Sequence, residues 1–150
     1  MKLMSTGVDM VLEEITFTIL GEPASKANSR KAVMFGTRPA FIKSDKARGY
    51  VTVFASQCPK LEVPFKADVR VEMLIYYASR RPDLDESLIL DCMQGPIYLN
   101  DRQVKQKMIY WSLDKANPRT IIRVSAVEKI PSYLSLTSED VMYVLPSRKT

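Results

Sequence analysis

Apolar and polar residues alternate in two segments of the N-terminal half. Residues 15–19 read Ile-Thr-Phe-Thr-Ile, and this segment ends at Gly21 and Pro23. Residues 66–77 place valine, methionine and isoleucine on one face and charged residues on the other, before both faces become apolar. A two-residue period is typical of a half-buried strand. We therefore predict strands over 15–19 and 66–77.

Between these strands, apolar residues recur at the spacing of an α-helix, from residue 45 to about residue 57. Ser44 is a good N-terminal cap, Asp45 in the first turn favours the helix dipole, and Pro59 lies just beyond the last turn. The residues that we expect to pack on the sheet are Ala47, Tyr50, Val51, Phe54 and Ala55.

A basic stretch ahead of this helix predicts an exposed loop followed by a hairpin. We place the two hairpin strands at 32–35 and 40–43, with the turn at Gly36 and Thr37. The densest positive charge in the first half of the chain lies here, in Lys26, Arg30, Lys31 and Arg38.

The second half of the chain predicts a short helix and two more strands. Leu84, Leu88 and Cys92 share a helical face, and the Gly-Pro pair at 95–96 ends the helix. Further strands are expected at 104–113 and 119–127.

The resulting order of elements predicts an α+β (mixed α/β) fold in two layers, with a mixed or largely antiparallel β-sheet and two helices. Residues 1–14 show no clear period, so we expect a loosely ordered N-terminal extension. The domain itself should span 15–127. A C-terminal extension at 128–150 would contain a short helix from Ser138.

Composition favours an acidic partner. A chain of 150 residues with 46% apolar and 26% charged residues is typical of one globular domain. Its net charge of +5 and pI near 9.2 favour nucleic acid ahead of an anionic membrane. The chain has no run of about 18 apolar residues, and Asp9, Glu13 and Glu14 interrupt its N-terminal segment. We therefore expect a soluble, cytoplasmic protein.

The chain contains no histidine, which excludes histidine-ligated zinc, Ser-His-Asp and Cys-His nucleophiles and every histidine general base. Cys58 and Cys92 do not form a C-x-x-C pair. Any chemistry must therefore use carboxylates, lysine, tyrosine or water on a metal.

An acidic cluster directly follows the strand at 66–77. Residues 82–86 read Pro-Asp-Leu-Asp-Glu, behind Arg80 and Arg81. A solvated acidic turn is one interpretation. The other is a metal site, because side chains two apart in extended chain point to the same side, so Asp83 and Asp85 could both face one divalent cation. Asp101, in the turn after the short helix, is a third candidate ligand.

These motifs, in this order, resemble the RusA family of Holliday junction resolvases (crossover junction endodeoxyribonucleases). The sequence RRPDLDE, a short helix and YLNDRQV is similar to the family's Asp-x-Asp-Asn and its later Asp-Asp with Gln-Val. Upstream, GEPASKANSRKA is similar to the family's G-x-P-x-x-K segment, and AFIKSDKARGYV to its entry into the first helix. The resemblance spans residues 15–127.

The resemblance implies a RusA-like homodimer that makes paired, symmetric nicks in four-way DNA junctions during recombination and repair. Its cofactor would be Mg²⁺, with Mn²⁺ as a substitute, and its partner branched DNA, without a membrane or a small-molecule cofactor. A phage or prophage origin stays open. Matched residue by residue, Asp83, Asp85 and Asp101 correspond to the family's catalytic, metal-binding aspartates.

Two positions depart from the family pattern. Glu86 replaces an asparagine and is either a fourth metal ligand or a helix cap; Ile89 replaces a functional lysine. Arg80, Arg81, Lys105 and Lys107 are candidate replacements for that cation, and we predict Lys105 as the catalytic one because of its nearness to Asp101. Two alternatives stay open: a degenerate protein that binds branched DNA without cutting it, or a nuclease for flaps or forks. The residues expected to bind DNA are Lys26, Arg30, Lys31, Lys46, Arg80 and Arg81.

Overall fold

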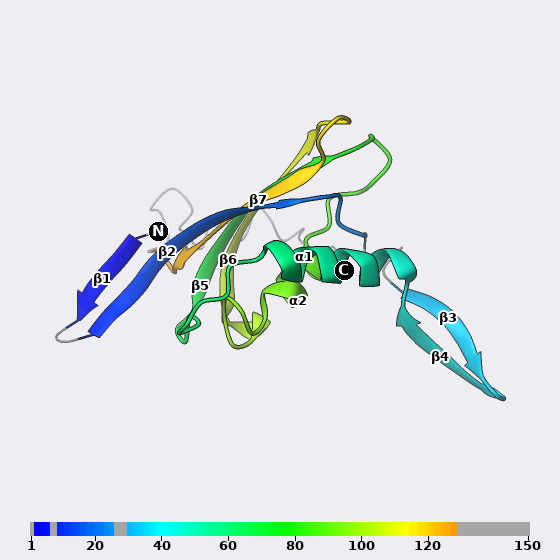
Figure 1. Ribbon diagram of the computed structural model, residues 1–150, viewed down its shortest axis with the longest axis horizontal. Helices are drawn as coiled ribbons and strands as arrows, with labels where there is room; N and C mark the ends of the chain where they lie inside the picture. Colours follow the sequence, from blue (N-terminus) through cyan, green and yellow to red (C-terminus); the bar gives the residue numbers. More distant parts are fainter. Residues whose placement is uncertain (1, 7–8, 26–29, 129–150) are drawn as a thin grey trace, which may run out of the picture.

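The computed structural model describes residues 2–6, 9–25 and 30–128. It contains a sheet with two helices on one face and a separate hairpin (Figure 1). The strands are β1 (Lys2–Thr6), β2 (Asp9–Leu20), β3 (Arg30–Phe35), β4 (Arg38–Lys43), β5 (Val69–Tyr77), β6 (Val104–Leu113) and β7 (Arg119–Ala126). The helices are α1 (Asp45–Gln57) and α2 (Ser87–Met93), with a 3₁₀ turn η2 (Asp101–Gln103).

Five strands form a mixed sheet in the order β1-β2-β7-β5-β6. All neighbours are antiparallel except β5 and β6, which are parallel and are connected by the segment that contains α2. Strands β3 and β4 pair only with each other and project away from the body beyond α1 (Figure 1). The predicted α+β class, the mixed sheet and the hairpin are therefore confirmed.

The core lies between the helices and one face of the sheet. Strand β5 alternates strictly, with Val69, Val71, Met73, Ile75 and Tyr77 buried. Helix α1 is capped as predicted, because the Ser44 hydroxyl accepts a hydrogen bond from the Ala47 amide at 3.2 Å. It buries Ala47, Tyr50 and Phe54, whereas Ala55 is exposed, contrary to expectation. No helix among the described residues is long and apolar enough to cross a membrane.

The N-terminal segment corrects one expectation. Residues 2–6 and 9–14 are strands, where the sequence pattern predicted no element. Strand β2 pairs with β1 along its first half and with β7 from Glu14 onward. Met10, Val11 and Leu12 form a continuous apolar run, which hides the two-residue period from a sequence pattern.

Helix α2 corrects the expectation about which of its residues are buried. It begins at Ser87 and buries Leu88, Ile89 and Met93, whereas Leu84 is 40% exposed. The predicted face of Leu84, Leu88 and Cys92 is therefore shifted, because residues 78–86 are an extended loop that carries Leu84 outside the helix. The helix expected from Ser138 lies outside the described residues.

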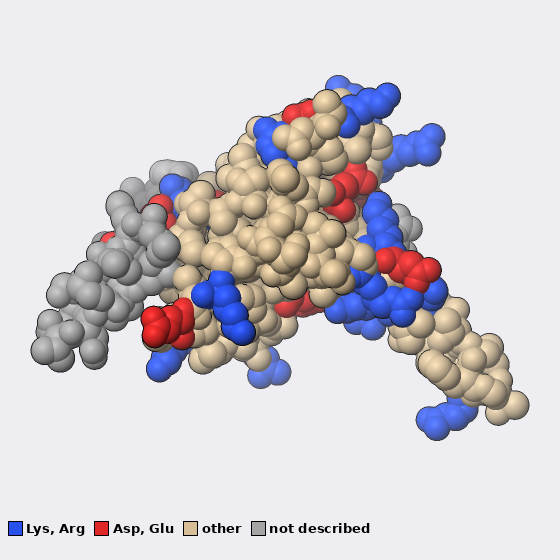
Figure 2. Space-filling view, viewed as in Figure 1, with Lys and Arg blue, Asp and Glu red and all other residues tan. Residues whose placement is uncertain are grey.

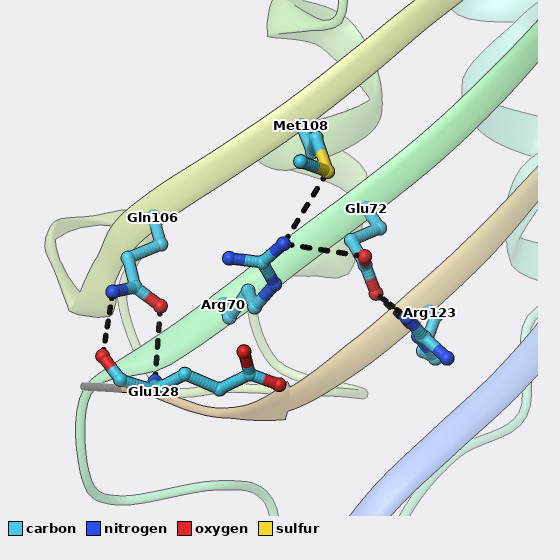
Figure 3. Close-up of polar contacts among 6 residues, drawn as sticks. All are labelled: Arg70, Glu72, Gln106, Met108, Arg123 and Glu128. Carbon is cyan, nitrogen blue, oxygen red and sulfur yellow. Dashed lines mark hydrogen bonds and ion pairs between the residues drawn. The ribbon is translucent and has the colours of Figure 1, made fainter. Parts of the chain in front are cut away.

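The face of the sheet away from the helices carries its own charges (Figure 3). Glu72 on β5 forms ion pairs with Arg70, at 3.4 Å, and with Arg123 on β7. Gln106 on β6 exchanges two hydrogen bonds with the Glu128 backbone, at 2.7 and 3.0 Å. These polar groups pair with one another within β5 and with neighbouring strands, and we assign them to the structure of the sheet.

Candidate active site

The predicted acidic cluster lies on residues 78–86, which we call the acidic loop. This loop leaves the end of β5 and folds back along β6. The Trp111 indole N–H donates to the Pro82 carbonyl at 3.0 Å, and Lys107 Nζ lies 2.8 Å from Glu86 Oε1. Because Pro82 meets the later residue of β6 and Glu86 the earlier one, the loop runs opposite to the strand.

Two aromatic side chains hold the backbone of the acidic loop through hydrogen bonds. Tyr77 and Trp111 stack with ring centroids 5.7 Å apart and an angle of 24° between the ring planes. The Tyr77 hydroxyl accepts a hydrogen bond from the Asp85 amide at 3.1 Å. Burial raises the pKa of Tyr77, and the carboxylates of Asp85 and Glu22 raise it further. The phenol thus stays protonated while it holds the loop backbone.

Glu22 is a member of the site that the sequence pattern did not reveal. Its Oε2 accepts a hydrogen bond from the Ala78 amide at 2.6 Å, and its Oε1 lies 3.4 Å from Lys46 Nζ on α1. The side chain is 19% exposed. The amide that it contacts lies 56 positions away and carries no side-chain signature, so only the fold could reveal this contact. Glu22 thereby ties the start of the acidic loop to α1.

Asp83 and Asp85 differ in their surroundings. Asp85 Oδ1 accepts hydrogen bonds from the Ser87 amide at 3.0 Å and the Ser87 hydroxyl at 2.6 Å, at the start of α2. Asp83 is exposed, and its carboxylate makes no hydrogen bond or ion pair within the described residues. Arg80 and Arg81 are exposed as well. The loop therefore presents one open carboxylate and two open guanidinium groups.

Glu86 does not cap α2 through its side chain, although it occupies the N-cap position. The predicted capping position is therefore confirmed, but without a side-chain capping hydrogen bond, and metal ligation by Glu86 stays a prediction. Its ion-pair partner, Lys107, is the lysine that lies against the acidic loop. Lys105, the predicted catalytic cation, is exposed on β6, near a register irregularity between β5 and β6. The position of the family's lysine holds Ile89, which is 0% exposed.

Asp101 lies on the other side of α2, along the chain, from the other two aspartates. Its amide donates to Gln94 Oε1 at 3.0 Å, directly after the end of α2, whereas Asp85 precedes the start of that helix. Seven helical residues span about 10 Å. Among the described residues, the three aspartates are not arranged as one metal-binding group.

Gln103 fixes the turn that carries Asp101. Its amide oxygen accepts from the Leu99 and Asn100 amides, both at 2.9 Å, and its amide nitrogen donates to the carbonyls of Phe65 and Ala67 at 2.7 and 2.8 Å. A half-buried amide group whose oxygen and nitrogen each have two partners stabilises one conformation of the turn. The glutamine of the predicted Gln-Val motif therefore has a structural role.

The donor atoms of the acidic loop suit a hard divalent cation, because Mg²⁺ and Mn²⁺ prefer carboxylate oxygens. In the part of the chain that the structure describes, however, no group of three or more Asp, Glu or Cys side chains is arranged to hold a metal ion. Asp83 and Asp85 are thus at most a two-carboxylate site. Mg²⁺ is often bound by one or two carboxylates together with substrate phosphates, so this pair alone is chemically sufficient.

Three of the predicted DNA-binding residues lie on β3 and α1, and one of them, Lys46, contacts Glu22. Arg30 and Lys31 are exposed on β3, and Lys46 is exposed on α1; Lys26 lies outside the described residues. Lys31 also lies 3.4 Å from Asp45, which forms a second ion pair with Arg48. Figure 2 shows basic side chains gathered where the hairpin joins the body. A backbone phosphate could meet cations from several elements at this place.

Comparison with known proteins agrees with the family resemblance seen in the sequence. A family model described as endodeoxyribonuclease RusA matches residues 21–125, which is more than two thirds of the chain and includes Glu22, the acidic loop and Asp101. No curated protein matches the chain significantly. From its extent and from the motifs that it covers, the chain belongs to the RusA endodeoxyribonuclease family.

Proposed function

We propose that this protein is a structure-specific endodeoxyribonuclease that resolves four-way DNA junctions by paired, symmetric nicks. Membership of the RusA family supports this activity and a branched DNA substrate. Two symmetric cuts in a nearly twofold junction need two sites related by a twofold axis, so the active form would be a homodimer.

The observation that carries the proposal is the open carboxylate of Asp83 on a firmly held loop. Glu22, Tyr77 and Trp111 fix the backbone on both sides of it. A carboxylate that accepts no hydrogen bond in the described structure contributes little to stability. It is, however, preorganised to meet a cation or a substrate group, as a catalytic residue must be.

Asp83 and Asp85 are the residues that we assign to Mg²⁺, with Mn²⁺ as a substitute. When bound, such an ion supplies an activated water and neutralises charge on the phosphate. Glu86 and Asp101 are proposed as further ligands that do not join this pair in the free protein. We assign Arg80, Arg81, Arg30, Lys31 and Lys46 to the DNA backbone, together with Lys26. Lys105 remains the predicted catalytic cation, and Lys107 is its competitor because of its contact with Glu86.

The burial of Ile89 favours a second candidate function. The family's lysine is replaced by an apolar core residue here, so no cation can act from this position. A protein without a replacement for that lysine would bind branched DNA and leave it intact. This candidate differs from the first only in the chemical step.

The deciding experiment is cleavage of an end-labelled four-way junction in Mg²⁺ or Mn²⁺, comparing the unchanged protein with Asp83→Asn. We expect symmetric nicks from the unchanged protein and at least a 100-fold slower reaction from Asp83→Asn, with junction binding preserved because the variant places less negative charge near phosphates. A matched control is Glu62→Gln, which neutralises another exposed carboxylate, outside the acidic loop. It should cleave normally.

The possible results separate the candidates. Binding without cleavage at any metal concentration would support the non-cleaving protein. A flap or fork cut as fast as the junction would assign another substrate. Loss of folding in Asp83→Asn would contradict a catalytic role, because removal of an exposed charge without partners should leave the free energy of unfolding within about 0.5 kcal/mol.

A further inference from the structure

The β3–β4 hairpin carries one sign of charge. Residues 30–43 include four basic residues and no acidic residue; the basic ones are Arg30, Lys31, Arg38 and Lys43. At the turn, Gly36 has φ of +65°, a conformation that costs other residues energy and allows a two-residue turn. The hairpin is thus a short, basic arm that projects from the body (Figure 1).

The two faces of the arm differ in exposure. Residues paired across the ladder lie on the same face. Met34 pairs with Pro39, and Ala32 with Phe41, so these four share one face, which ends at its base in the pair of Arg30 and Lys43. On this outer face Met34 is 64% and Phe41 72% exposed. The other face includes Val33, Ala40 and Ile42, which are partly buried, and Phe35 beside the turn, which is 62% exposed. The two faces therefore differ in exposure along the hairpin but not beside its turn.

The outer face is not part of the core. The buried cluster and the apolar residues packed against it include none of Met34, Pro39 and Phe41. A two-stranded hairpin has little stability of its own, and exposed apolar residues lower its solubility. Large apolar side chains on such an arm therefore point to a partner.

The charge of the arm identifies the class of that partner. A second copy of the chain would bring a hairpin with the same four positive charges, so two arms would repel each other. DNA offers phosphates for the cations and base faces for the apolar residues. Phe, Met and Pro are the side chains that proteins insert between DNA base steps, and aromatic rings stack on unpaired bases.

We propose that the β3–β4 hairpin is a DNA-binding arm whose outer face, Met34, Pro39 and Phe41, packs on unstacked bases at the branch point. Arg30 and Lys43 at its base, and Arg38 at its tip, hold the neighbouring phosphates. This inference rests on the proposed branched-DNA substrate and adds the element that distinguishes a branch from linear duplex. The cations act on any DNA, whereas the apolar face acts only where bases are exposed.

The test uses the full chain and a four-way junction with 2-aminopurine at the branch point, beside a linear duplex with the same label. Binding is measured in Ca²⁺ or EDTA, so that no cleavage is needed. We expect the double variant Met34→Ser/Phe41→Ser to bind the junction at least tenfold more weakly, to lose the 2-aminopurine fluorescence change, and to bind linear duplex as before.

Phe35→Ser is the matched control, because Phe35 is 62% exposed on the same hairpin but pairs with Arg38 on the other face. It should bind both DNAs within about threefold of the unchanged protein. Arg38→Gln changes no apolar contact and should weaken junction and duplex equally, with a salt dependence lower by about one phosphate contact. It also provides a test if the double variant does not fold.

Unchanged junction binding by the folded double variant would overturn the proposal, as would an equal effect of Phe35→Ser. A double variant that loses self-association in sedimentation but keeps its DNA affinity would overturn it too, in favour of an interface between copies. If Arg38→Gln binds both DNAs normally, the phosphate contact is wrong. Because binding is measured without cleavage, a protein that never cuts DNA can still show the hairpin's preference for junctions. A double variant that cuts junctions normally would refute the DNA-binding arm and leave the proposed cleavage activity in place.

Discussion

The acidic loop and the β3–β4 hairpin both leave the core, but they are held in opposite ways. The loop is fastened by a carboxylate, a phenol and an indole from three different segments, through Glu22, Tyr77 and Trp111. The hairpin has its own ladder and an open outer face. A cutting site needs fixed geometry, whereas an element that meets branched DNA of variable shape can function with fewer constraints.

The largest difference should appear when the same truncation is made in the core and on the hairpin. Phe54 on α1 is 1% exposed and Phe41 is 72% exposed. We expect Phe54→Ala to lower the free energy of unfolding by about 3–5 kcal/mol, and Phe41→Ala to change it by less than about 0.5 kcal/mol. Urea unfolding followed by circular dichroism measures both. A cost above about 1.5 kcal/mol for Phe41→Ala would mean that the outer face is covered by the protein itself.

A smaller effect should follow from releasing the loop. Glu22→Ala removes the acceptor of the Ala78 amide, so we expect the free energy of unfolding to fall by about 1–3 kcal/mol and junction cleavage to slow about tenfold. Glu22→Gln keeps an acceptor oxygen and loses only the ion pair with Lys46, whose side chain is half exposed. It should recover most of the cleavage rate.

The Glu22 variants also separate positioning from binding. Because Glu22 holds the loop that carries the catalytic candidates, the maximal cleavage rate should fall while the affinity for a junction stays within about twofold. An Ala variant that loses affinity and keeps its rate would assign Glu22 to the DNA-binding surface instead.

The smallest effect is a pH dependence of the free energy of unfolding, caused by two cysteines outside both the acidic loop and the hairpin. Burial raises the pKa of the Cys58 and Cys92 thiols from 9.0 to about 11. The unfolded chain therefore releases these protons first, so the thiols contribute stability below pH 9 that is lost as the pH rises towards 11. Both thiols are only half-buried, so solvent screens part of this effect, and the loss at pH 9 stays below about 0.4 kcal/mol per thiol. A double Cys→Ala variant should show a shallower decline between pH 8 and 10, whatever its loss of packing. An unchanged decline would exclude the thiols as its cause.

Much of the fold could be predicted from sequence because its strands alternate cleanly and its first helix has a cap and a proline beyond its end. Strand β6 was predicted with its observed bounds, and β5 with its buried face. Strand β2 extended further than predicted because part of it is apolar on both faces. Helix α2 lies between the acidic cluster and Gly95 as predicted, but its predicted face was shifted because a loop residue, Leu84, mimicked its periodicity.

The candidate site was less predictable because its contacts are long-range. The aspartate motif located the acidic loop, but a pattern in one dimension does not show that β5 and β6 are parallel or that α2 separates Asp85 from Asp101. The same limit explains the choice among lysines. Lys105 is nearer to Asp101 in sequence, whereas the return of the loop along β6 brings Lys107 to Glu86.

The parallel pairing of β5 and β6 has a consequence for the order of folding. Parallel strands cannot be closed by a short turn, so the whole crossover between Tyr77 and Val104 must be ordered before the pair is complete. All three candidate aspartates lie on that crossover. Gln103 closes it by donating hydrogen bonds to the carbonyls of Phe65 and Ala67, which lie 38 and 36 positions earlier in the chain. The β3–β4 hairpin is local by comparison. The acidic residues on this crossover therefore reach their final positions only when the long-range pairing of β5 and β6 is complete.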